Sequence, residues 1–108
     1  MRIFITSDHA GFELKTKLVP FLRSLNYEVS DMGPATFDPS DDYPDFVLSM
    51  ARELSNFAST STSRSAAGII LGGSGEGEAM AANRISGIRA AVYYGGPLEI
   101  VHLSREHN

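Results

Sequence analysis

The sequence contains no cysteine among its 108 residues, and this absence removes several kinds of chemistry at once. Such a chain forms no disulfide, offers no thiolate to a metal ion and carries no cysteine nucleophile or base. Histidine is also scarce, with three residues dispersed at positions 9, 102 and 107. A metal centre is therefore not expected.

Long apolar runs and an excess of positive charge are missing as well. No apolar stretch approaches the roughly 18 residues that a membrane-spanning helix needs, and the N-terminus enters a strand pattern rather than a signal peptide. The net charge is -4 and the sequence pI is about 5.2. Because no basic stripe is present to neutralise phosphates, a nucleic-acid partner is disfavoured. We expect a cytoplasmic protein that binds neither membranes nor nucleic acid.

The chain does have a regular alternation of short apolar segments and helical periodicities. Its length suits one compact domain, which we expect to comprise the whole of residues 1–108. Strands are predicted at 3–6, 27–29, 68–71 and 88–93, and helices at 12–25, at 44–54, after Gly77 and from about Pro97. This alternation predicts an α/β fold with a doubly wound, Rossmann-like, mostly parallel sheet and helices on both faces.

Two segments are expected to interrupt this regularity. Pro20 falls inside the first predicted helix and is expected to kink or interrupt it. The segment 55–65 is rich in serine and threonine. That composition is typical of a mobile connection.

The most informative segment is Leu71-Gly72-Gly73-Ser74-Gly75-Glu76-Gly77-Glu78, which lies between a predicted strand and a predicted helix. Its four glycines let the backbone take positive φ and bring its N–H groups close to a bound group. Such a nest of amides at the start of a helix attracts anions. Glu78 would stand in the first helical turn, facing that group. Anion-stabilising donors beside a possible base are what proton abstraction next to a carbonyl requires.

Other interpretations of this segment stay open. It lacks the Gly-Lys-Ser/Thr ending of a Walker A loop, and it follows the third strand, whereas the dinucleotide fingerprint follows the first. The glycines could form a tight turn without a ligand. Glu78 could be a first-turn carboxylate that the helix dipole favours. Glu76 is expected to point to solvent.

Asp8 and His9 follow the first predicted strand. The carboxyl ends of parallel strands share one edge of a sheet, so these residues are neighbours of the glycine loop if strand order reverses between strands one and three. The aspartate could orient a sugar hydroxyl or accept its proton, and the histidine could bind phosphate or shuttle a proton. Both are also common turn residues. His107, close to the last residue of the sequence, is by position alone more typical of a frayed and idle side chain.

Five motifs, in order, resemble the ribose-5-phosphate isomerase type B family, whose superfamily includes the galactose-6-phosphate isomerase subunits. They are Ser-Asp-His-Ala-Gly-Phe-x-Leu-Lys at 7–15, Asp-Tyr-Pro-Asp at 42–45, the glycine loop at 72–78, Ala-Ala-Asn-Arg at 81–84 with Gly-Ile-Arg-Ala at 87–90, and Ser-Arg-Glu-His-Asn at 104–108. The resemblance covers essentially the whole chain and is specific for the superfamily.

The resemblance implies an enzyme that interconverts aldose and ketose phosphates without metal or organic cofactor. It also implies a homodimer whose active sites span both subunits. The expected reaction is the isomerisation of ribose 5-phosphate to ribulose 5-phosphate. One branch of the family uses a cysteine base at the place of Gly72, whereas a second branch uses a glutamate that Glu78 matches. Glu78 would move a proton between C2 and C1 through a cis-enediolate.

The other roles follow from the same resemblance. The implied catalytic residues are Glu78, Ser74, Asp8 and His107. The implied substrate-binding residues are His9, Tyr43, Gly73, Gly75, Gly77 and Asn108. The loop amides and the serine hydroxyl would stabilise the oxyanion, and Asp8 would contact sugar hydroxyls and help move a proton between oxygens. His107 would assist ring opening, Asn108 would bind the open chain, His9 would contact the phosphate, and Tyr43 would help wall the pocket.

The family pattern also differs from this sequence in one respect. The family continues beyond the His-Asn motif through a fifth strand and a C-terminal helix, which carry arginines that grip the phosphate. We expect both elements to be missing here, which leaves Arg84, Arg89 and Arg105 as the available substitutes. Two alternatives stay open: an isomerase of a six-carbon aldose phosphate, and a non-catalytic subunit that binds a sugar phosphate.

Overall fold

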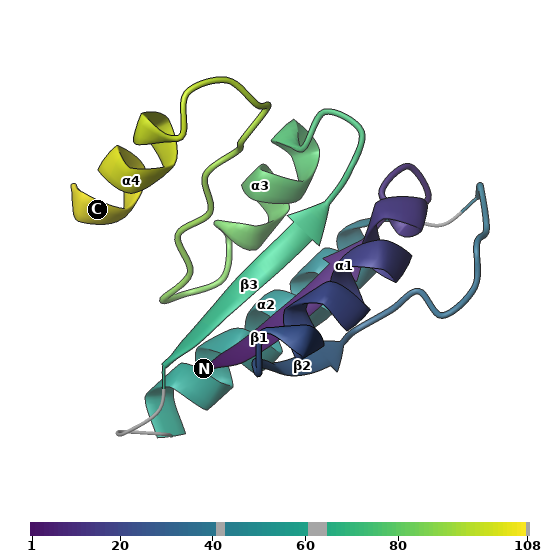
Figure 1. The fold of residues 1–108 in the computed structure, drawn as a ribbon, viewed down its shortest axis with the longest axis horizontal. Helices are drawn as coiled ribbons and strands as arrows, with labels where there is room; N and C mark the ends of the chain where they lie inside the picture. Colours follow the sequence, from purple (N-terminus) through teal and green to yellow (C-terminus); the bar gives the residue numbers. More distant parts are fainter. Residues whose placement is uncertain (41–42, 61–64, 108) are drawn as a thin grey trace.

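The computed structural model describes residues 1–40, 43–60 and 65–107 (Figure 1). The elements, in chain order, are β1 Arg2–Ser7, α1 Phe12–Ser24, β2 Glu28–Asp31, α2 Tyr43–Thr60, β3 Ala66–Leu71, α3 Glu76–Ala82 and α4 Glu99–Glu106. The predicted alternation of strands and helices is therefore confirmed through α3. None of the helices formed by the described residues has the length and apolarity that crossing a membrane requires.

The sheet has the strand order β2-β1-β3, and both pairings are parallel. In the register, Arg2 of β1 pairs with Glu28 on one side and with Ala66 on the other. The chain thus passes from β1 outward to β2 and then returns across β1 to β3. Strand order reverses between β1 and β3, as the sequence-based prediction of neighbouring strand ends required.

The two faces of the sheet are covered by different helices. Ile3 and Ile5 of β1 pack against Val19 and Leu22 of α1. On the other face Phe4 meets Phe57 of α2 edge to face, with ring centroids 5.7 Å apart. A second cluster joins α2 to α3 through the buried side chains of Val47, Ala51 and Ala82. Apolar residues that alternate along β1 thus serve both layers, which makes the fold doubly wound.

Pro20 was predicted to kink or interrupt α1, and it does not interrupt it, because the helix is continuous from Phe12 to Ser24. Proline removes one backbone N–H, whose acceptor would be the carbonyl of Thr16. Both residues lie on the exposed side of the helix. Water can therefore hydrogen-bond to the Thr16 carbonyl, so this carbonyl is not buried without a partner.

Two further expectations about secondary structure were wrong. Helix α2 extends to Thr60, so the predicted connection 55–65 is helical in its first half, while residues 61–64 lie outside the described part of the chain. No strand forms at 88–93 among the described residues. Within this segment the Asn83 side chain binds both backbone groups of Ala90: its Nδ2 donates to the carbonyl at 3.0 Å and its Oδ1 accepts the N–H at 2.8 Å. Those two backbone groups are thereby withdrawn from strand pairing.

Helix α4 stands apart from the sheet in Figure 1, beyond α3 and the extended segment that follows it. None of its residues is buried. Its apolar side chains are largely exposed, with 56% for Ile100, 43% for Val101 and 44% for Leu103. The predicted final helix is therefore present, and its apolar face has little cover within the described residues.

Candidate active site

The carboxyl ends of β1 and β3 are joined directly at the point where strand order reverses. The backbone N–H of Asp8 donates to the Leu71 carbonyl at 3.0 Å, which extends the β1–β3 pairing into the two loops. Gly11 lies so close to Leu71 that a Cβ there would collide with the Leu71 backbone. Ala10 lies near Gly73 without crowding it, since its Cβ is 3.8 Å from the position of a Cβ added at Gly73. The turn after β1 and the glycine loop therefore form one surface.

Asp8 is buried at this junction, with 7% of its surface exposed. Its Oδ1 accepts the backbone N–H of Gly11 at 2.9 Å. A carboxylate that accepts a backbone N–H three residues later closes the turn that leads into α1. The same hydrogen bond fixes the direction of the Asp8 side chain.

Glu78 projects from the first turn of α3 into the same junction and is 6% exposed. Its carboxyl group lies against Gly72, where an added Cβ would collide with it. Burial raises the pKa of the Glu78 carboxyl, and a hydrogen bond to Asp8 together with the Asp8 charge raises it further. A hydrogen bond from the backbone N–H of Glu78 acts in the opposite direction. Because of this raised pKa, Glu78 keeps its proton to a higher pH than an exposed glutamate does.

The glycine loop turns the chain from β3 into α3 around Gly75, which has φ +81° and precedes the helix. That positive φ is open to glycine at little cost. Ser74 Oγ accepts the Glu76 N–H at 3.2 Å, and both of these residues are exposed. The serine hydroxyl proton is left to donate to a bound group. Glu76 points to solvent, as predicted.

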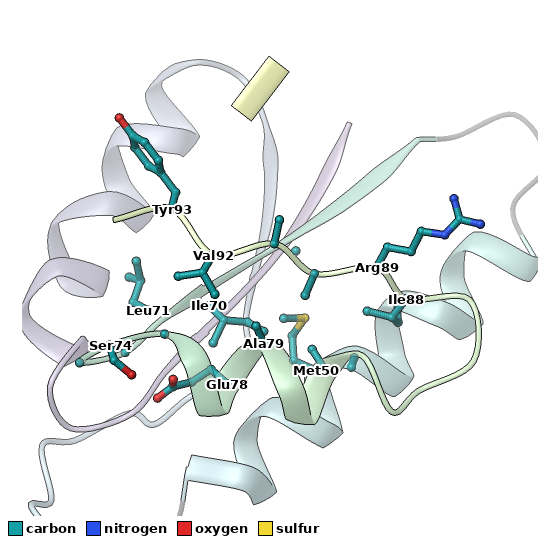
Figure 2. Close-up of a pocket in the computed structure, with 18 of the residues that line it drawn as sticks. Met50, Ile70, Leu71, Ser74, Glu78, Ala79, Ile88, Arg89, Val92 and Tyr93 are labelled. Carbon is teal, nitrogen blue, oxygen red and sulfur yellow. The ribbon is translucent and has the colours of Figure 1, made fainter. Parts of the chain in front are cut away.

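A pocket of about 450 Å³ opens beside this junction (Figure 2). Glu78 and Ser74 line it at one end, together with Gly73 and Gly75. Its remaining walls come from β3, α2, α3 and the extended segment 88–94, with Leu14 of α1. Ile88 and Ala90 of that segment pack against the cluster shared by α2 and α3. The two hydrogen bonds between the Asn83 side chain and the Ala90 backbone therefore also help to fix a wall of the pocket.

The structure brings together only part of the predicted site. Gly77 lies within α3, and His9 is exposed on the turn after β1. Tyr43 is the first residue of α2, and its side chain lies outside the described part of the chain, as does Asn108. His107 follows the last turn of α4 and does not line the pocket.

Sequence reasoning missed two features of the site. It treated Asp8 and Glu78 as separate candidates and did not anticipate that they share a hydrogen bond. It also passed over Phe37, whose ring packs against His9 with centroids 6.4 Å apart. An aromatic residue in an otherwise polar loop was the available signal.

Comparison with known proteins identifies the lineage of this site. A model of the Ribose/Galactose Isomerase family matches residues 3–108. The chain belongs to this family.

Members of the ribose/galactose isomerase family resemble the chain in both sequence and fold. Ribose-5-phosphate isomerase B of Mycolicibacterium paratuberculosis is 40% identical over all 108 residues, which span 63% of that protein. The solved structure of the Mycoplasma genitalium enzyme, with bound ribulose-5-phosphate, has a TM-score of 0.85 and 37% identity, and the match covers 98% of this chain and 65% of that one. The solved structure of the Clostridium thermocellum enzyme has a TM-score of 0.81 and 41% identity, and the match covers 99% of this chain and 66% of that one. The chain thus spans about two thirds or less of the length of these relatives.

Substitution of Gly72 by alanine tests the close packing of the Glu78 carboxyl. We expect Gly72→Ala to lower the free energy of unfolding by about 1–3 kcal/mol, because the new methyl group must displace that carboxyl. Gly73→Ala is the matched control, since its Cβ would meet only the Ala10 Cβ at 3.8 Å. Urea unfolding measures both. In a Glu78→Ala background the cost of Gly72→Ala should largely disappear, and an unchanged cost would show that the carboxyl is not the obstacle.

The pH dependence of stability tests the raised pKa of Glu78. A carboxyl whose pKa is higher in the folded state contributes stability below its unfolded pKa, and this contribution is lost as the pH rises through the folded pKa. Between the unfolded-state and folded-state pKa of Glu78, we therefore expect wild type to lose stability relative to Glu78→Gln. The expected loss is about 1.4 kcal/mol for each unit by which the folded-state pKa exceeds the unfolded-state pKa. Urea unfolding between mildly acidic and neutral pH measures the difference. The exposed Glu76→Gln variant should run parallel to wild type, and a constant difference for Glu78→Gln would contradict the raised pKa.

Proposed function

We propose that the chain isomerises a sugar phosphate between its aldose and ketose forms, with ribose 5-phosphate and ribulose 5-phosphate as the pair. One observation carries the proposal: the buried Glu78 carboxyl is hydrogen-bonded to Asp8 beside the glycine loop, in a chain of the ribose/galactose isomerase family. The ribulose-5-phosphate in the Mycoplasma genitalium structure supports this choice of substrate.

The carboxyl pair suits a proton transfer between neighbouring carbons. Once ionised, Glu78 takes the proton from C2 of the aldose, and the C–H electron pair forms the C1–C2 double bond of a cis-enediolate. The carbonyl oxygen at C1 gains negative charge in this step. Returning the proton to C1 yields the ketose. A raised pKa brings the base closer to neutral pH, where a general base combines availability with driving force.

The neighbouring groups are assigned to the oxygens of the substrate. The amides of Gly73, Gly75 and Gly77, with the Ser74 hydroxyl, stabilise the developing oxyanion. Asp8 contacts the sugar hydroxyls and helps to move a proton between O1 and O2, and its hydrogen bond with Glu78 supports a shared path for protons.

The remaining predicted residues are assigned to ring opening and binding. His107 assists ring opening and Asn108 binds the open chain. His9 contacts the phosphate, and Tyr43 helps wall the pocket. The resemblance to the family motifs supports these four assignments.

Conversion of ribose 5-phosphate to the ketose tests the role of Glu78. We expect Glu78→Gln to lower kcat about 10²- to 10⁴-fold, because the amide cannot accept the C2 proton. Glu76→Gln is the matched control, since Glu76 lies in the same loop but is exposed. Activity within about twofold of wild type is expected for that control, because a surface change leaves the chemistry intact.

Solvent exchange separates the proposed mechanism from simple binding. In D₂O, NMR should show deuterium entering C2 of ribose 5-phosphate with wild type and not with Glu78→Gln. Equal exchange with both proteins would remove Glu78 as the base. Binding of the substrate by wild type without any exchange would favour a non-catalytic sugar-phosphate subunit. Turnover of a hexose phosphate in preference to the pentose would favour the six-carbon alternative.

We further propose that the enzyme is a homodimer with active sites that span both subunits. His107 follows the last turn of α4, and Figure 1 shows this end of the chain far from the loop between β3 and α3. One subunit therefore does not by itself join His107 to Glu78. The exposed apolar side chains of α4 support a partner surface at the same element.

Mixing two inactive variants tests the shared site. We expect Glu78→Gln and His107→Ala each to lose most activity, and an unfolded and refolded equimolar mixture to regain up to about a quarter of wild-type activity, because half of the dimers are then mixed and each holds one intact site. Light scattering gives the oligomeric state. A monomer, or a mixture as inactive as its components, would contradict the shared site.

A further inference from the structure

An aromatic side chain outside the predicted site lies directly on one of the predicted binding residues. Phe37 belongs to the connection that leaves β2, and its side chain is largely exposed, with 57% of its surface open to solvent. Its ring meets the His9 imidazole at 6.4 Å between centroids and an interplanar angle of 80°. It meets the Phe12 ring at 6.0 Å and 63°. Both are edge-to-face contacts, the arrangement that aromatic rings favour.

We propose that Phe37 is a positioning residue for substrate binding, which holds the His9 imidazole in the orientation that receives the phosphate. This inference rests on the proposed function, in which His9 contacts the phosphate. The imidazole forms no hydrogen bond or ion pair within residues 1–40, 43–60 and 65–107, so the Phe37 ring is the contact that restricts its rotation there.

Phe37 can restrict His9 because Phe12 is itself held in place. Phe12 is half-buried at the start of α1, and the Lys15 ammonium group lies 5.6 Å from the centre of its ring. Lys15 is 3% exposed at its side chain and donates to both carboxylate oxygens of Asp31, at 2.8 and 2.9 Å. Asp31 Oδ1 also accepts the Gly33 N–H at 2.9 Å. This ion pair, between a buried lysine and an exposed aspartate, thus ties α1 to the start of the connection that carries Phe37.

The position of His9 makes its orientation matter for binding rather than for proton transfer. His9 follows the buried Asp8 and is itself exposed, and Ala10 lies near Gly73 of the glycine loop, so the imidazole stands at the rim of the junction. It does not line the pocket beside Glu78. A residue that restricts His9 before the substrate arrives lowers the entropy lost on binding. Its loss should therefore raise KM and leave kcat nearly unchanged.

Steady-state kinetics with ribose 5-phosphate tests this division. We expect Phe37→Ala to raise KM about two- to tenfold, the range that one aromatic pair provides, with kcat within about twofold of wild type. Phe37→Tyr should restore KM, since it keeps the ring. Phe21→Ala is the matched control, because Phe21 is 56% exposed but lies on α1 away from His9. An unchanged KM in Phe37→Ala, or failure of Phe37→Tyr to restore it, would overturn the proposal.

Proton NMR of the imidazoles gives a readout that does not depend on activity. The three histidines are assigned with His9→Ala, His102→Ala and His107→Ala. We expect the His9 ring resonances to move in Phe37→Ala and to stay in place in Phe21→Ala. Titration with inorganic phosphate should shift His9 in wild type and require about two- to tenfold more phosphate in Phe37→Ala.

The two readouts distinguish failure of the inference from failure of the proposed function. Where wild type does not isomerise the sugar phosphate, the proposed function fails and the phosphate titration alone decides the role of Phe37. His9 resonances that do not respond to phosphate, or that respond identically in Phe37→Ala and wild type, overturn the inference even in an active enzyme.

Discussion

The parallel pairing of β1 with β3 is the constraint on which the rest of the candidate site depends. It continues past the strands through the hydrogen bond from the Asp8 N–H to the Leu71 carbonyl. That bond places the turn after β1 against the glycine loop and brings two carboxyl groups from distant parts of the sequence into one buried contact. Helices α1 and α2 contribute by covering opposite faces of β1, so that the central strand has little freedom to shift its register.

The carboxyl pair has consequences for both stability and chemistry. Burying two acidic groups in contact disfavours the state in which both are charged, and burial together with the neighbouring Asp8 raises the pKa of Glu78. Gly72 is part of the same arrangement, since only a residue without a Cβ leaves room for the Glu78 carboxyl. The family resemblance places a cysteine base at the position of Gly72 in another branch. A base at 72 and a carboxyl at 78 would therefore compete for one space, which gives a steric reason for using one or the other.

Much of this fold could be predicted from the sequence because its signals are local. The apolar run at 3–6, the helical periodicity after Phe12 and the glycines at 72–77 each determine their own segment. The segment 88–93 shows where local signals stop. Its side chains alternate between partly buried and exposed, as in a strand, but no strand forms there, and the Asn83 amide takes both backbone groups of Ala90. No sequence pattern within 88–93 indicates that a side chain seven residues earlier binds the backbone of Ala90.

The site was predictable in its residues more than in its contacts. Asp8, Ser74 and Glu78 stand out by type and by their place after strands, because function at a parallel sheet gathers at the carboxyl ends. The hydrogen bond between Asp8 and Glu78 depends on the separation of two side chains across the β1–β3 junction, which no spacing along the chain records. Phe37 illustrates the same limit: its ring meets His9 across two separate loops, and the Lys15–Asp31 ion pair joins α1 to the end of β2 nearby. Residue types therefore indicated which chemistry was possible, and the packing between strands and connections determined which groups can act together.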